Sequence, residues 1–300
     1  MEIQWPLLIF SVLLGMGSGL LVFIGVGELK GAFKKVRFVL AVSALALLAA
    51  GGIASTFHLG HIDRAFHILG NLNSAFSHEL FAVAFAAIVA LVYAVLSRKD
   101  YPAASKVVGI LALVAGIVLP LTAGISFMMP ARPAWDSFTL PLMYLGTGLG
   151  MGLVLGAAIV YLKGDAQDAK TALLVAIVGV VCSIVTMVAY VAAIAMAPFP
   201  HESRSLARLT SGSLAVEFWV GVVLLGIVVP AALVALTAKR SPKASAGGEA
   251  VALEQGAGYL CAAFVCLVVG SVVLRTIMYA VACRTSSKSN SICRRGYNYN

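Results

Sequence analysis

Three ionisable side chains near the ends of apolar stretches are suited to acting together on protons: His58, Glu79 and Arg275. A neutral imidazole accepts a hydrogen bond and takes up a proton near neutral pH, because its pKa lies at about 6.5. A nearby carboxylate can hold the imidazolium or pass the proton to water, and a guanidinium stabilises negative charge on an oxygen. These residue types therefore suit the removal of protons from a hydroxylated substrate, and we expect Glu217 or Asp63 to pair with Arg275.

Each of these residues also has a purely structural explanation. His58 can be an interfacial or capping residue, Glu79 can favour a helix N-terminus through the helix dipole, and Arg275 can extend to the membrane surface. A charge inside a membrane span costs about 3 kcal/mol, which keeps Glu79 and Arg275 functional candidates. Trp135 and Asp136 open another apolar stretch, where an aromatic belt and helix capping explain them.

The elements that must hold these residues are membrane spans. Of 300 residues, 61% are hydrophobic and only 11% are charged, and the mean hydropathy is +1.01. A soluble protein has about a quarter of its residues charged. A soluble enzyme, a nucleic-acid-binding protein and a secreted disulfide scaffold are therefore excluded.

Eight apolar runs are long enough to cross about 30 Å of hydrocarbon as helices. They lie near 6–27, 38–57, 80–97, 107–126, 138–162, 171–196, 214–237 and 257–281. No run alternates polar and apolar residues as barrel strands do, and the first lacks the positive start of a signal peptide. We predict an all-α integral membrane protein with eight transmembrane helices in 1–283 and a polar, disordered tail at 284–300.

The Lys and Arg residues divide unequally between alternate loops. Residues 28–37, 97–106, 163–170 and 239–243 hold twelve, whereas the other loops hold four and the tail after Cys283 holds four more. Because cytoplasmic loops carry the excess of Lys and Arg, both termini are predicted to lie outside.

All five histidines fall on the outside-assigned end, together with Asp63, Glu79, Asp136, Glu202 and Glu217. Between the second and third runs, residues 57–80 place apolar side chains every three or four positions and polar ones on the other face. This pattern predicts a helix lying in the membrane interface that covers a pocket between helix ends, and Gly70-Asn71 is a point at which it can break. His61, His67 and His78 are expected to face solvent or a partner.

Several stretches resemble the membrane anchor subunit of dimethyl sulfoxide reductase. These are the opening WPLLIF, the run from Ala54 to Phe66, the SHEL before the third span, and an Arg followed by a Tyr in the last span. The resemblance extends over most of the eight spans and is densest in 54–80.

The resemblance implies a chain of the bacterial cytoplasmic (inner) membrane that oxidises menaquinol near the periplasmic face. It implies a heterotrimer, in which electrons pass to an iron–sulfur subunit and then to a molybdopterin catalytic subunit. It places the quinol-site histidine on His58, as proton acceptor, and the glutamate on Glu79, as relay. With Arg275 as electrostatic partner, the expected quinol-binding set is His58, Gly60, Arg64, Glu79 and Arg275.

Other cofactors and functions are less consistent with the sequence. Haem is not expected, because the sequence has no pair of histidines on facing spans. An iron–sulfur cluster or another metal is not expected either, because the spacing of Cys182, Cys261 and Cys266 does not suit one. These cysteines are expected to be packing residues, and Gly148, Gly152 and Gly156 predict a close helix crossing. The alternatives are an anchor for a related sulfur-compound or oxyanion reductase, and a small-solute transporter, against which we find no internal repeat and no charge at the bilayer midplane.

Overall fold

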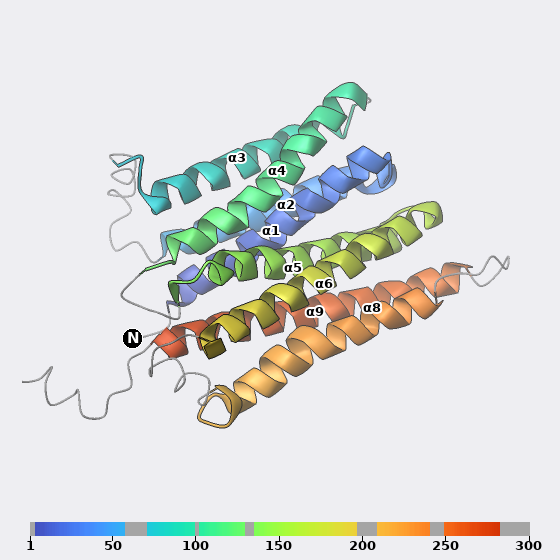
Figure 1. The fold of residues 1–300 in the computed structure, drawn as a ribbon. Coiled ribbons are helices and arrows are strands. Elements are labelled where there is room, and N and C mark those ends of the chain that lie inside the picture. Colours follow the sequence, from blue (N-terminus) through green and yellow to red (C-terminus); the bar gives the residue numbers. More distant parts are fainter. Residues whose placement is uncertain are drawn as a thin grey trace, which may run out of the picture.

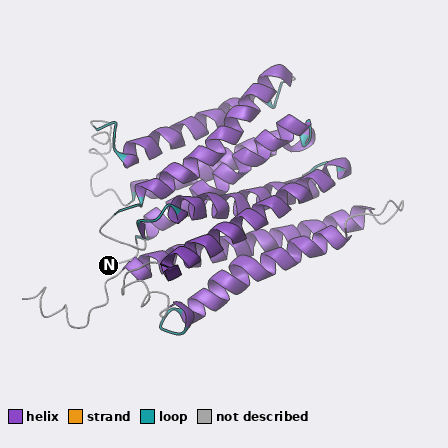
Figure 2. Ribbon diagram, in the orientation of Figure 1, coloured by secondary structure: helices purple, strands orange, loops and turns teal. Residues whose placement is uncertain are grey.

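The computed structural model describes residues 4–57, 71–99, 102–129, 135–196, 209–240 and 249–282. The helices in these ranges are α1 (Trp5–Lys30), the 3₁₀ helix η1 (Lys34–Val36), α2 (Arg37–Thr56), α3 (Ala75–Leu96), α4 (Pro102–Ser126), α5 (Thr139–Lys163), α6 (Ala166–Met196), η4 (Glu217–Val228), α8 (Val229–Arg240) and α9 (Glu249–Ala282). With η4 and α8 forming one continuous span, they provide eight helices long and apolar enough to cross a membrane. The predicted all-helical, eight-span fold is confirmed, and the described ranges contain no strand (Figure 2).

Helices α1 and α5 form the centre of the bundle, and most of their residues are buried. α1 packs against α2, α4 and α5, while α5 also packs against α6 and α9. α3 covers one flank through α4 and α2, and η4 with α8 covers the other through α9 (Figure 1). Both helices are apolar on every side, as suits spans that are surrounded by other helices or by lipid.

A row of glycines lets α1 and α5 approach closely. A Cβ at Gly19 would meet the carbonyl of Gly148, and a Cβ at Gly152 would meet the Cα of Gly19. A Cβ at Gly156 would lie 2.5 Å from Cγ of Phe23. The glycine spacing therefore marks a close helix crossing, as the sequence predicts.

The seventh span changes its winding part of the way along. Its first half, η4, is π-helical and its second half, α8, is α-helical. Pro230 stands just after the change and lacks the N–H that an α-helix would use there. Near the change, Gly226 packs directly against Gly270 of α9.

The predicted interfacial helix over 57–80 does not extend to its end. Residues 71–74 form a turn, and α3 begins at Ala75 with Ser74 as its N-cap, whose hydroxyl accepts a hydrogen bond from the Ser77 N–H at 3.1 Å. The last residues of the segment thus belong to a span, because the Ser74 cap starts a new helix. Residues 58–70 lie outside the described ranges, as does the predicted tail at 284–300.

The end of the bundle opposite the start of α1 is held by one buried ion pair and by hydrogen bonds. Glu28 of α1 forms a salt bridge with Arg37 of α2 at 2.6 Å (Oε1 to Nε) and accepts a hydrogen bond from Tyr93 of α3. The backbone N–H of Phe33 donates to Asp168 of α6 at 2.8 Å. These contacts tie four helices together and leave no buried charge unpaired among them.

Candidate functional site

The candidate residues that the structure describes gather at the end of the bundle where α1 begins and α9 ends (Figure 1). Arg275 lies seven residues before the end of α9, and Glu79 lies four residues after the start of α3. At about 1.5 Å per residue, both side chains start within about 11 Å of their helix ends. The structure therefore brings Glu79 and Arg275 to the same end and to a similar depth.

Arg275 is fully enclosed by other helices, with 1% of its surface exposed. Its Nη1 donates to the Ser11 hydroxyl of α1 at 3.1 Å, and its Nη2 lies 3.5 Å from the Thr147 hydroxyl of α5. The guanidinium carbon lies 4.1 Å from the centroid of the Tyr144 ring. Arg275 thus points into the bundle and does not extend to the membrane surface.

Among the described residues, no carboxylate forms an ion pair with Arg275. The expected pairing with Glu217 is wrong, because Glu217 is exposed at the start of η4. Asp63, the other expected partner, lies outside the described ranges. The Nε atom of Arg275 is buried with no hydrogen-bond partner in the described part of the chain. An unpaired buried cation favours the binding of a group that carries or develops negative charge.

Glu79 is also turned toward other helices, with 7% of its surface exposed. The Ser126 hydroxyl at the end of α4 lies beside its carboxylate. Its Oε1 atom is buried and has no hydrogen-bond partner within the described residues. Ser74, not Glu79, caps α3, so helix capping does not explain why this carboxylate is buried.

Four aromatic side chains pack together beside Arg275. The ring centroid of Phe127 lies 5.5 Å from that of Tyr144 and 6.0 Å from that of Trp135, and Trp135 lies 5.4 Å from Tyr279. Trp135 donates from its indole N–H to the Met278 carbonyl at 3.0 Å and is 2% exposed. The expectation that Trp135 belongs to an interfacial belt is therefore wrong, because its indole is buried in this cluster.

Sequence reasoning missed Ser11, Ser126, Tyr144 and Thr147, which surround the two charged residues. Tyr144 and Thr147 are three residues apart in α5 and share a helix face, as do Arg275 and Tyr279 four residues apart in α9. Polar residues repeated at this spacing within an apolar span were the available signal.

The remaining residues of the expected set, His58, Gly60 and Arg64, lie outside the described ranges. They follow directly after Phe57, at the end of α2, which packs against α3. Among the histidines, only His78 is described, and its side chain is exposed while that of its neighbour Glu79 is buried.

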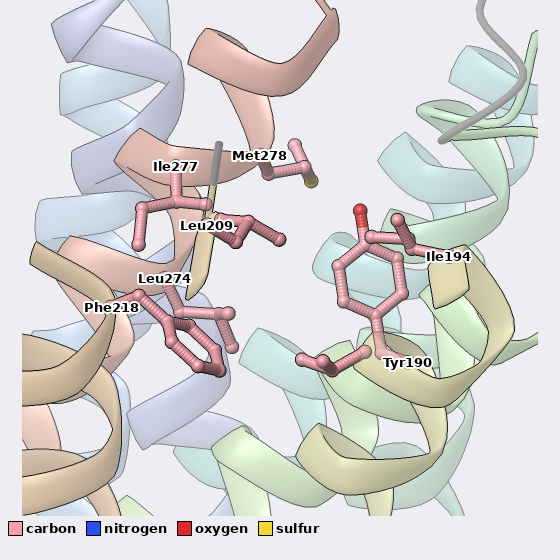
Figure 3. A pocket seen from close by; sticks show the side chains of 8 residues that line it. Tyr190, Ile194, Leu209, Phe218, Leu274, Ile277 and Met278 are labelled. Carbon is pink, nitrogen blue, oxygen red and sulfur yellow. The ribbon is translucent and has the colours of Figure 1, made fainter. Parts of the chain in front are cut away.

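An apolar pocket lies beside the same turn of α9, between α6 and η4 (Figure 3). Its lining residues are Tyr190, Val191, Ile194, Leu209, Phe218, Leu274, Ile277 and Met278. Leu274 and Arg275 are adjacent in α9, so this turn presents one side chain to the pocket and the next to the polar cluster. The described lining residues carry no charged group, unlike the cluster around Arg275.

Metal ligands do not cluster in the described part of the chain. No three His, Cys, Asp or Glu side chains there are placed to hold an ion. Cys182, Cys261 and Cys266 are free and partly buried in α6 and α9. Because four of the five histidines lie outside the described ranges, the absence of a metal stays a prediction.

Comparison with known proteins gives one result at the level of the family. A family model described as "DMSO reductase anchor subunit (DmsC)" matches residues 1–281, which is nearly the whole chain. A comparison with curated proteins found no match.

Proposed function

The chain belongs to the DMSO reductase anchor subunits, and from this membership we propose that it oxidises menaquinol for its complex. It is a multi-pass membrane protein and the anchor of a DMSO reductase-type molybdoenzyme. The finer proposal is that it lies in the bacterial inner membrane and faces the periplasm. It would pass electrons to an iron–sulfur subunit of a heterotrimer.

One observation supports this proposal above the others. Arg275 is buried with no carboxylate partner among the described residues, and Glu79 at the same end is buried with an unpartnered oxygen. A quinol ring has an oxygen that needs a cation as it loses its proton and a hydroxyl that needs an acceptor. The residues present therefore fit a quinol headgroup, with aromatic walls that suit its ring.

The chemistry assigned to this chain is the handling of protons. Oxidation of a quinol to a quinone releases two protons and two electrons. His58 accepts a hydroxyl proton, Glu79 passes it toward water, and Arg275 stabilises the negative charge left on the ring oxygen. The electrons go to the iron–sulfur partner, and the protons leave at the end that holds the site.

Proton transfer across the membrane is not part of this mechanism. Every described Asp, Glu, His, Lys and Arg lies within about two turns of a helix end. Glu28 is buried at the opposite end, but it is paired with Arg37. The described spans thus offer no chain of ionisable groups between the two ends.

The test uses the assembled complex in membranes and the substitution His58→Ala. We expect quinol-driven reduction of the partner to fall on the order of 100-fold, because a general base typically contributes 10²- to 10⁴-fold. Binding of a fluorescent hydroxyquinoline N-oxide, a quinol analogue, should weaken as well. Reduction driven by a soluble dye should be unchanged, since the dye reaches the partner subunits directly.

His78→Ala is the matched control, because His78 is exposed and lies beside buried Glu79. It should retain quinol-driven activity within about twofold. Unchanged quinol oxidation in His58→Ala would contradict the assignment of His58 as the proton acceptor. A neighbouring coding region without a ferredoxin-like protein and a molybdopterin protein would also count against the proposed heterotrimer.

A further inference from the structure

The ring of Tyr144 packs against Arg275 of the proposed site. Its centroid is 4.1 Å from the guanidinium carbon of Arg275. Tyr144 is 2% exposed, so this contact is made away from water, where electrostatic contacts are strongest.

The surroundings of Tyr144 hold it in one position. Phe127 packs against its ring with centroids 5.5 Å apart, and α5 is fixed to α1 by the glycine crossing one turn further along. The next turn of α5 also supplies Thr147, whose hydroxyl lies 3.5 Å from Nη2 of Arg275. One stretch of α5 thus determines where the guanidinium lies.

Arg275 needs such a support because no described carboxylate fixes its direction. A planar guanidinium stacks on an aromatic face, and the stack sets the plane in which its N–H groups point. A small change at Tyr144 would therefore move the cation relative to the proton acceptor.

We propose that Tyr144 is a positioning residue of the quinol site. Its ring face holds the plane of the Arg275 guanidinium, and that plane sets the direction in which the cation meets the quinol oxygen. The inference rests on the proposed function, because it concerns how the quinol oxygen meets Arg275. Its role is to orient the binding groups, so it should affect affinity more than turnover.

The test compares Tyr144→Phe, which keeps the ring, with Tyr144→Leu, which removes the ring and the hydroxyl. Tyr161→Phe is the matched control, because Tyr161 lies near the other end of α5 and its buried hydroxyl has no described partner. The variants are measured in the assembled membrane-bound complex. The measurements are the Kd of the hydroxyquinoline N-oxide, and KM and kcat with menadiol, a naphthoquinol without a tail.

Tyr144→Leu should raise Kd and KM about tenfold with kcat within about twofold, because the cation–π contact that orients Arg275 is lost in a dry site. Tyr144→Phe, which keeps the ring, should raise both less than Tyr144→Leu, and Tyr161→Phe should match the wild type. If Tyr144→Leu matches Tyr161→Phe, or Tyr144→Phe binds as weakly as Tyr144→Leu, while the wild type binds the analogue, the inference fails and the proposed function stands. If the wild type shows no saturable binding of the analogue, both the inference about Tyr144 and the proposed function fail.

Discussion

At the scale of single residues, Arg275 has the most informative environment. Removing an ion from water costs several kcal/mol, and a buried arginine normally recovers that cost from a carboxylate. Here a cation–π contact contributes about 2 kcal/mol and two hydroxyl contacts contribute about 1 kcal/mol each. These gains do not obviously repay the cost, which is typical of a group kept for function.

Arg275→Met should have opposite effects on the thermal stability of the complex and on its binding of the quinol analogue. Methionine has a similar length and no charge, so the thermal midpoint of the detergent-solubilised complex should stay equal or rise by a few degrees. Binding of the hydroxyquinoline N-oxide should weaken at least tenfold, because the cation is lost. Midpoints are read from size-exclusion chromatography after heating, and binding from fluorescence quenching.

Arg240→Met is the control, since Arg240 is exposed near the other end of the bundle and contacts Gln255 and Tyr259. It should change neither measurement beyond about twofold in binding or a degree in midpoint. A large fall in the thermal midpoint of Arg275→Met with binding retained would mean that Arg275 is structural.

At the scale of helices, the crossing of α1 and α5 positions the site. Ser11 of α1 and Thr147 of α5 contact the same guanidinium from two sides. The glycines that set the separation of these helices lie within two turns of those hydroxyls. Helix spacing and site geometry are therefore linked.

Gly152→Ala should destabilise the bundle and weaken quinol binding together. The added Cβ would meet Cα of Gly19 and the backbone N of Leu20, and backbone atoms cannot move aside as a side chain can. Overpacking of this kind typically costs about 1–3 kcal/mol. The wider crossing would also draw Ser11 away from Arg275, so the Kd of the hydroxyquinoline N-oxide should rise.

Gly258→Ala provides the contrast, because a Cβ there meets nothing within 4 Å. Alanine favours a helix over glycine by about 1 kcal/mol, so this variant should be equal to the wild type or more stable. Equal thermal midpoints for the two variants would show that close packing of α1 on α5 does not determine the stability of the bundle.

The sequence was sufficient to predict the spans, because about 20 apolar residues in a row have few alternatives in a membrane. It also predicted the glycine crossing, and it selected Glu79 and Arg275 by their rarity. It did not reveal Tyr144, Ser126 or the burial of Trp135, because their roles depend on contacts between helices distant in sequence. The sequence allowed a break at Gly70-Asn71, and the turn at 71–74 begins there. The continuation of the interfacial helix to residue 80 was wrong, because amphipathic spacing runs on through the turn, although Ser74 offered a capping signal.

At the scale of the whole molecule, the two ends of the bundle differ in how their charges are arranged. At the end with η1, Glu28 and Asp168 are satisfied by Arg37 and by the Phe33 N–H. At the other end, Glu79 and Arg275 each keep a buried polar atom with no described partner. The charges at the η1 end therefore stabilise the bundle, whereas Glu79 and Arg275 at the other end are available to bind a ligand.

The distribution of Lys and Arg also predicts which side of the membrane the end with Glu79 and Arg275 faces. Twelve Lys and Arg residues lie in the loops of the opposite end, so the positive-inside rule places that end in the cytoplasm. Alkaline phosphatase, which is active only after export, should be active when fused after Ala282 and inactive when fused after Gly164. Green fluorescent protein at the same positions should give the reverse pattern. Phosphatase activity after Gly164 with none after Ala282 would put the Glu79–Arg275 end in the cytoplasm. Quinol protons would then be released inside, and the iron–sulfur partner would have to dock there.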